Sequence, residues 1–343
     1  MREKPKKVLV AVNDLVRVGG AEMYTFDLIK AFAASKKIEV EYFTVNKGLV
    51  SEKIEAELQV PFMSQKKYDL IFATHNTTVK ELFGRGPIIQ ICHGTILEPE
   101  QPSPLADYHV AISQEIADHL TDLGYANEVV LNGIDIKVKK PIKPIHKTLT
   151  SVLSLCQSEK ANKMLRTVCD RKGLRFEAYN KHKNPTNNIE QEINNFDMVV
   201  GIGRSIYDAM ACGRPSLIYD NRGYNGNKAD GYLRPENFSK YVKKNCSGRY
   251  LNREYHEREL IRELEKYNPE DGEKLRNIAM SHLNAYKMAD QLLNTANQLN
   301  WRNRLNKWRR FATHTKLVKH AFLYKKIYAL TKNEYFNRSS VSK

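Results

Sequence analysis

The sequence has 343 residues, with 55 Lys and Arg against 39 Asp and Glu, and therefore a formal net charge of +16. At about 100–200 residues per domain, this length predicts two domains, each large enough for its own core. Apolar residues make up 41% and charged residues 27%, which excludes a disordered chain. No apolar stretch approaches the roughly 18 residues of a spanning helix, which excludes a transmembrane bundle.

The positive charge is concentrated in residues 301–343, which hold twelve basic side chains and one acidic one and so carry +11 of the +16. Eight aromatic residues are interspersed with these cations. Such a basic, aromatic helical tail favours either an anionic membrane surface or packing on the protein body. Binding of nucleic acid is the weaker alternative, because no recognition motif accompanies the charge.

The cysteines indicate a reduced protein without a cysteine zinc site or a disulfide framework. They are widely spaced and form no C-x-x-C pair, whereas zinc sites and disulfide frameworks need clustered or paired cysteines. We therefore expect a cytoplasmic chain in which each thiol packs in the interior. The five are Cys92, Cys156, Cys169, Cys212 and Cys246.

In the first 140 residues, short apolar runs alternate with helical patterns. One helix is predicted over residues 21–34, and alternation of this kind predicts a parallel sheet covered on both faces. The expected strands are 8–12, 40–45, 69–73, 88–92 and 108–112.

A proline- and lysine-rich linker near residue 140 precedes a second alternation of strands and helices. The sequence thus predicts an α/β protein with domains at 1–140 and 141–300, a cleft between them and a tail at 301–343. Ligands of such folds bind at the carboxyl ends of the strands. In the second domain the expected strands are 151–156, 174–179, 197–200 and 215–219, the expected helices are 158–172 and 205–212, and residues 255–300 are expected to be mainly helical.

Gly19 and Gly20 follow the first predicted strand and open the first helix. Glycines at this place let the backbone approach a ligand, and a helix N-terminus offers free N–H donors to an anion. The alternative is a plain tight turn in which Glu22 favours the helix start electrostatically.

A second glycine turn, containing Gly201 and Gly203, leads from a strand into a helix with Ser205 as its predicted N-cap. Arg204 in this turn can add a charge-assisted hydrogen bond to phosphate. Asp208 lies one turn further on, where a carboxylate can accept two hydrogen bonds from a ribose diol. The alternative is an ordinary strand–turn–helix.

Two histidines end neighbouring predicted strands. His93 precedes Gly94, and His75 precedes Asn76. A lone histidine is usually structural, but two at the carboxyl edge of a sheet are well placed to contact a ligand.

With these motifs in order, the sequence resembles nucleotide-sugar glycosyltransferases of the GT-B fold, most like a divergent bacterial branch of glycosyltransferase family 4. In that fold two Rossmann-like domains face each other across a cleft. The motifs that carry the resemblance are Gly19–Glu22, His93-Gly94, 106–115, Asn132-Gly133-Ile134-Asp135 and 208–215.

The resemblance implies transfer of a sugar from a nucleoside diphosphate to an acceptor hydroxyl, with retention of configuration and without a metal or other cofactor. His93 and Arg204 are then the expected catalytic residues. The implied donor-binding residues are Gly19, Gly20, Gly201, Gly203, Arg204, Ser205, Asp208 and Lys160. The implied contacts to the acceptor or sugar are Glu22, His75 and Asn76.

The implied acceptor is a lipid-linked molecule or a polysaccharide of the bacterial cell envelope, and the implied location is the cytoplasm or the inner face of the cell membrane. The sequence departs from the family pattern at two places. Val200 occupies the position of the first motif glutamate, and the loop 156–163 lacks the family's basic pair, for which Lys160 is the stand-in. The alternatives are a nucleotide-sugar isomerase (epimerase) of the same fold and a polyanion-binding protein without catalytic activity.

Overall fold

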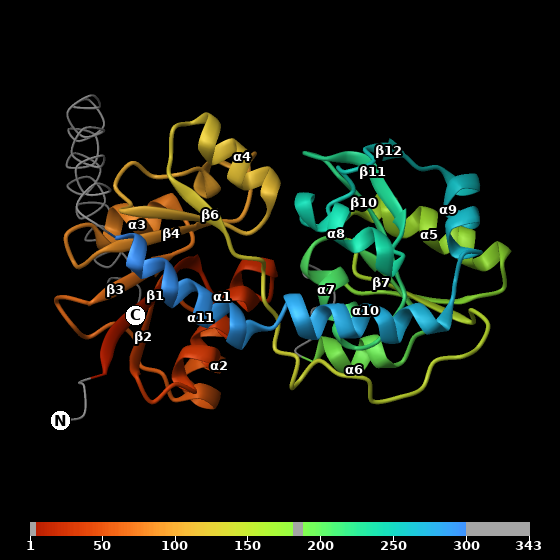
Figure 1. The fold of residues 1–343 in the computed structure, drawn as a ribbon. Helices are drawn as coiled ribbons and strands as arrows, with labels where there is room; N and C mark the ends of the chain where they lie inside the picture. The colour runs from red at the N-terminus through yellow and green to blue at the C-terminus, as the bar shows by residue number, and fades with distance from the viewer. Residues whose placement is uncertain (1–4, 181–187, 300–343) are drawn as a thin grey trace, which may run out of the picture.

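Two α/β domains make up the computed structural model, which describes residues 5–180 and 188–299 (Figure 1). The first domain has a parallel sheet in the order β2-β1-β3-β4-β5-β6. Its strands are largely buried runs of Val, Ile and Leu, as is typical of sheets covered on both faces. The strands are β1 (Lys6–Asp14), β2 (Ile38–Asn46), β3 (Leu70–Ala73), β4 (Ile88–Cys92), β5 (Tyr108–Ala111) and β6 (Asn127–Val129).

The second domain has its own six-stranded sheet in the order β12-β11-β10-β9-β7-β8. Four of these strands run parallel, and β11 and β12 add an antiparallel edge. The strands are β7 (Ser151–Ser154), β8 (Arg175–Ala178), β9 (Met198–Gly201), β10 (Ser216–Arg222), β11 (Gly226–Tyr232) and β12 (Arg253–Glu254).

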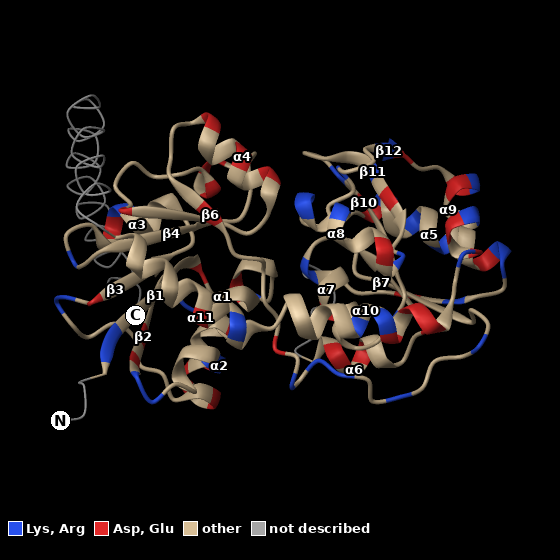
Figure 2. Cartoon of the chain, viewed as in Figure 1, with Lys and Arg blue, Asp and Glu red and all other residues tan. Residues whose placement is uncertain are grey.

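Helices connect and cover the strands of both sheets. The first domain contains α1 (Gly20–Ala33), α2 (Leu49–Leu58), α3 (Asn76–Leu82), the 3₁₀ turn η1 (Glu98–Glu100) and α4 (Gln114–Asp122). The second contains α5 (Glu159–Arg171), α6 (Ile189–Asn194), α7 (Arg204–Ala211), α8 (Phe238–Tyr241), α9 (Glu257–Leu264) and α10 (Pro269–His282), and the helix α11 (Ala285–Thr295) follows. Figure 2 shows charges of both signs mixed on the outer helices α9 and α10.

The predicted two-domain α/β fold is confirmed, and every strand that the apolar runs predict is present. The β10–β11 hairpin was not predicted, because β11 reads Gly226–Tyr232 with little apolar alternation. All five cysteines are buried and free, as expected. No helix among the described residues is long and apolar enough to cross a membrane. The predicted basic tail at 301–343 lies outside the described residues.

The chain passes between the domains twice, and the two crossings pair with each other. The Ile134 amide donates to the Leu283 carbonyl at 2.7 Å, and the Ala285 amide donates to the Ile134 carbonyl at 3.0 Å. After the second crossing, α11 packs against α1 and its apolar face joins the core of the first domain. The two crossings therefore form one hydrogen-bonded hinge at the base of the cleft.

Gly133 is the residue that lets the two crossings lie so close. A Cβ atom at this position would be 2.7 Å from the Ala285 Cα atom and 3.0 Å from Met288 side-chain atoms. The hinge hydrogen bonds fix the backbone of the other crossing, so moving it away from the added Cβ atom costs free energy. The Asn-Gly-Ile-Asp motif thus has a steric role at the hinge.

We expect Gly133→Ala to lower the free energy of unfolding by about 1–3 kcal/mol, because overpacking forces fixed backbone apart. Chemical denaturation measures the change. Gly223→Ala is the matched control, since a Cβ atom there meets nothing within 4 Å. Equal stability of the two variants would contradict the steric role of Gly133.

Candidate functional site

A cavity of about 980 Å³ lies between the two domains and is lined by both. Its walls are the loops that follow the carboxyl ends of β1 and β4 in the first domain and of β7, β9 and β10 in the second. This is the edge at which open α/β sheets bind ligands. The cavity is therefore the candidate site.

The N-terminus of α1 contributes one wall of the cavity. Gly19 is its N-cap and offers no side chain to cap the first amides of the helix. A Cβ atom on Gly20 would meet nothing within 4 Å, whereas one on Gly19 would lie 2.3 Å from Glu22 Oε2. The Glu22 carboxylate thus folds back over the glycine turn, and all three residues line the cavity.

The N-terminus of α7 lies on the other domain's side of the same cavity. Gly203 is its N-cap, again without a side-chain cap, and has a φ of 57°, a left-handed value that favours glycine. Gly203, Arg204 and Ser205 line the cavity. Gly201 does not, and its role is steric, because a Cβ atom there would be 2.9 Å from Ser205 Cβ.

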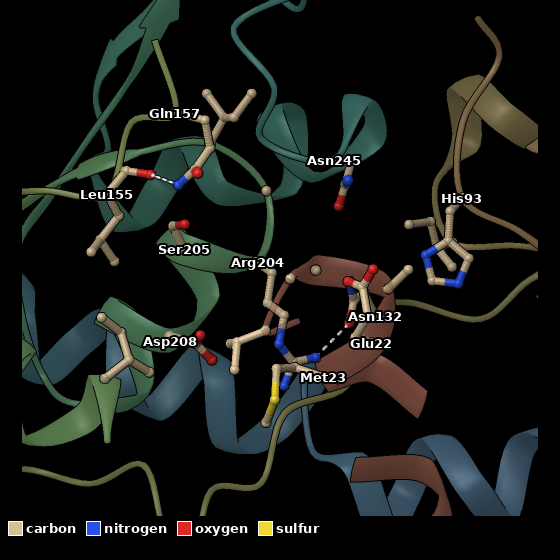
Figure 3. Close-up of a pocket in the computed structure, with 18 of the residues that line it drawn as sticks. Glu22, Met23, His93, Asn132, Leu155, Gln157, Arg204, Ser205, Asp208 and Asn245 are labelled. Carbon is tan, nitrogen blue, oxygen red and sulfur yellow. Dashed lines mark hydrogen bonds between the residues drawn. The ribbon is translucent and has the colours of Figure 1, made fainter. Parts of the chain in front are cut away.

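Arg204 reaches from α7 across to the first domain (Figure 3). Its Nη2 atom is ion-paired with Asp27 of α1, and Nη1 donates to Asn132 Oδ1 at 3.2 Å and to the Gly133 carbonyl at 3.1 Å. Both charged side chains are buried. Sequence analysis assigned this guanidinium to a diphosphate, but here it has three protein partners and binds the second domain to the hinge and to α1.

Asp208 lies one turn further along α7 and faces Lys139, whose Nζ atom is 3.8 Å from Oδ1. That oxygen is buried and accepts no hydrogen bond within the described residues. Burial raises the pKa of the Asp208 carboxyl, and the charges of Lys139 and Arg204 oppose the rise. An unsatisfied carboxyl oxygen at the cavity wall is suited to a ligand that carries hydroxyl donors.

Both predicted histidines line the cavity. Burial lowers the pKa of His75 to about 4 and that of His93 to about 3, so both rings are neutral at pH 7. His75 Nδ1 accepts the Asn13 amide at 3.2 Å, and His93 packs against the Tyr24 ring at 4.7 Å. His93 Nε2 is buried without a hydrogen-bond partner among the described residues. His93 is therefore a hydrogen-bonding group and too weak a base for proton abstraction near neutral pH.

Two further predicted site residues do not reach the cavity. Lys160 is exposed in the first turn of α5 and is not among the lining residues. Asn76 is buried, and its Nδ2 atom donates to the Glu98 carbonyl at 2.8 Å, so it holds the η1 turn in place. Sequence spacing placed both near the site because each follows a strand, but neither side chain turns inward.

Sequence analysis did not identify several charged residues that line the cavity. Arg249 of the second domain donates from Nε to Glu115 Oε1 of α4 at 3.0 Å, which forms a second ion pair between the domains. Lys30 is bonded to Asp135 at 2.7 Å. No motif marks Arg249 or Lys30, because each pairs with a partner distant in the sequence. Within the described residues, no group of His, Cys, Asp and Glu side chains is arranged to hold a metal ion.

Comparisons with known proteins show the fold and nothing finer. No family model and no curated protein matches the sequence. A glycosyltransferase of Rickettsia africae has a TM-score of 0.56 and 9% identity, over 87% of this chain and 99% of that one. A proposed UDP-N-acetylglucosamine 2-epimerase of Listeria monocytogenes has a TM-score of 0.54 and 12% identity, over 84% and 95%. The chain thus has the two-domain GT-B fold that its sequence resembles.

The Arg204–Asp27 pair yields a stability prediction. We expect Asp27→Ala to lower the free energy of unfolding by about 3–5 kcal/mol, because it leaves a buried guanidinium without its counter-charge. Adding Arg204→Met to that variant should restore most of the loss, since no buried charge then stays unpaired. Chemical denaturation of the single and double variants measures both effects.

The control is Glu265→Gln, which breaks the exposed Lys172–Glu265 pair and should cost less than about 1 kcal/mol. If Asp27→Ala cost no more than this control, the interdomain pair would not stabilise the protein.

Proposed function

We propose that the protein is a glycosyltransferase that moves a sugar from a nucleoside-diphosphate sugar to an acceptor hydroxyl. The observation that carries the proposal is the pair of uncapped helix N-termini, α1 and α7, that line one cavity from opposite domains. Backbone amides at such termini bind phosphate groups, and here they come from both sides of the cleft. The GT-B fold supports the same assignment.

The donor would lie with its diphosphate against α7. The free amides of the first turn and the Ser205 hydroxyl would bind the phosphate oxygens and stabilise the negative charge that develops on the leaving group. Arg204, held by Asp27, would add a fixed positive charge close by. Asp208 would accept hydrogen bonds from the ribose hydroxyls, which satisfies its otherwise unbonded oxygen.

The finer assignments rest on the sequence resemblance. It implies retention of configuration, no obligatory metal, and an acceptor on a lipid carrier or surface polysaccharide. Val200, at the first motif glutamate, is completely buried in the core of the second domain. The donor sugar is therefore contacted by other groups than a carboxylate at that position, and His93 with its unbonded Nε2 is the candidate.

An epimerase is the second candidate, because the Listeria protein of similar fold is described as one. The two activities differ in what they need. A transferase forms its product only with an acceptor, whereas an epimerase converts the nucleotide sugar alone. A non-enzymatic polyanion binder would consume no nucleotide sugar at all.

A panel of nucleotide sugars in a thermal-shift assay tests the proposal. Binding of a ligand to the folded state raises the apparent melting temperature. We expect at least one nucleotide sugar to do so and to be consumed when an acceptor is added. If no nucleotide sugar raised the apparent melting temperature, the proposed function would be overturned. Conversion of the nucleotide sugar without an acceptor would establish the epimerase instead.

Asp208→Asn tests the donor site within that assay. The amide group presents N–H donors where the ribose hydroxyls need acceptors, so we expect the dissociation constant to rise at least about tenfold. Asp118→Asn on the exposed face of α4 is the control and should leave binding unchanged. Unaltered affinity in Asp208→Asn would place the nucleotide elsewhere.

A further inference from the structure

The loop 245–249 forms the part of the cavity wall next to the start of α7, and no sequence motif marks it. Asn245 and Ser247 of this loop line the cavity. The loop is fixed to α7, because the Gly203 amide donates to the Cys246 carbonyl at 3.0 Å. Its side chains therefore lie beside the helix N-terminus to which the proposed function assigns the diphosphate (Figure 3).

The backbone of this loop is left-handed at two consecutive residues, with a φ of 53° at Asn245 and of 46° at Cys246. Residues other than glycine rarely adopt such values, and backbone strain of this kind is concentrated at functional sites. The Cys246 side chain is fully buried in the same core cluster as Tyr207, whereas the Asn245 side chain lies at the cavity. The strained turn thus presents Asn245 to the cavity.

A hydrogen bond fixes the orientation of the Asn245 side-chain amide. Tyr207 is buried, and its hydroxyl donates to Asn245 Oδ1 at 2.9 Å. The Nδ2 atom lies next to Gly203, 3.4 Å from where a Cβ atom of that glycine would be. Nδ2 donates no hydrogen bond within residues 5–180 and 188–299. Its two N–H groups are therefore available to an acceptor at the start of α7.

Ser247 provides a second, independent observation that points to a ligand. It is 5% exposed and lines the cavity, and its Oγ atom is buried without a hydrogen-bond partner in the part of the chain that the structure describes. A buried hydroxyl without a partner costs free energy. A bound group that accepts a hydrogen bond from Ser247 would recover this cost.

We propose that loop 245–249 is part of the donor site, where Asn245 Nδ2 and Ser247 Oγ donate hydrogen bonds to phosphate oxygens of the nucleoside diphosphate. This assignment rests on the proposed function and adds two residues that neither the motifs nor the comparisons indicate. Phosphate oxygens only accept, so donors from the loop complement the backbone amides of α7. The Arg204 guanidinium is held by Asp27, so the loop makes contacts that the guanidinium does not.

Asn245→Asp tests the contact with little change of shape. Aspartate tolerates the left-handed conformation and can still accept the hydrogen bond from Tyr207, but it sets a carboxylate against the phosphate. We expect the dissociation constant of the nucleoside diphosphate to rise at least about tenfold, because repulsion replaces a charge-assisted hydrogen bond. Isothermal titration calorimetry measures the change, with whichever of UDP, ADP and GDP the wild-type chain binds.

Asn252→Asp is the matched control. Asn252 is also left-handed, with a φ of 55°, and the substitution makes the same change of charge. It is exposed and is not among the residues that line the cavity. The control should therefore bind the nucleoside diphosphate as tightly as the wild-type chain does. Chemical denaturation checks that both variants are folded.

Ser247→Ala separates a contact with the ligand from a role in the fold. Because the Oγ atom has no partner among the described residues, its removal should leave the free energy of unfolding unchanged or raise it. The dissociation constant of the nucleoside diphosphate should nevertheless rise several-fold. Lower stability together with unchanged affinity would show that the hydroxyl serves the fold and would overturn its assignment.

A wild-type chain that binds a nucleoside diphosphate, together with an Asn245→Asp variant that binds it as tightly as Asn252→Asp does, would overturn the assignment of Asn245 alone. A wild-type chain that neither binds nor consumes any nucleotide sugar would overturn the proposed function, and the loop assignment with it.

Discussion

The buried guanidinium of Arg204 sets the relative position of the two domains. Arg204 is 9% exposed and belongs to the second domain, while its counter-charge, Asp27, is 3% exposed and belongs to the first. Separating them would leave a charge in a low-dielectric interior, which is far more costly than losing an exposed pair. The same guanidinium also holds Asn132 and Gly133 at the first crossing. The hinge and the ion pair thus form one unit.

The cavity takes its chemical character from this unit. Asp27 also accepts the Asp135 amide at 3.3 Å, so one carboxylate connects α1, the hinge and α7. The ion pair joins Arg204, the first residue of α7, to Asp27 within α1, and the charge of Asp208 also acts on Arg204. The donor half of the proposed reaction therefore depends on contacts between domains. The Arg249–Glu115 pair is a second interdomain contact.

Sequence reasoning succeeded where local patterns determine structure. Buried parallel strands are continuous apolar runs, and both glycine turns follow a strand and precede a helix, so the fold and the two glycine turns were predictable. The predicted N-cap Ser205 was wrong, because the left-handed Gly203 ends the turn and α7 begins at Arg204. Sequence reasoning could not find Asp27, because the partner of that carboxylate lies 177 residues further along the chain. Nor could it predict that burial keeps both histidines neutral. Those features arise only when distant segments pack together.

A crystal structure with a nucleoside diphosphate tests the central claim most directly, namely that the interdomain cavity binds the donor through the N-terminus of α7. We predict that the diphosphate contacts the amides of Arg204 and Ser205, that the ribose hydroxyls donate to Asp208, and that Arg204 remains paired with Asp27. A diphosphate bound outside this cavity, or a cavity that stays empty at saturating nucleotide, would contradict the account.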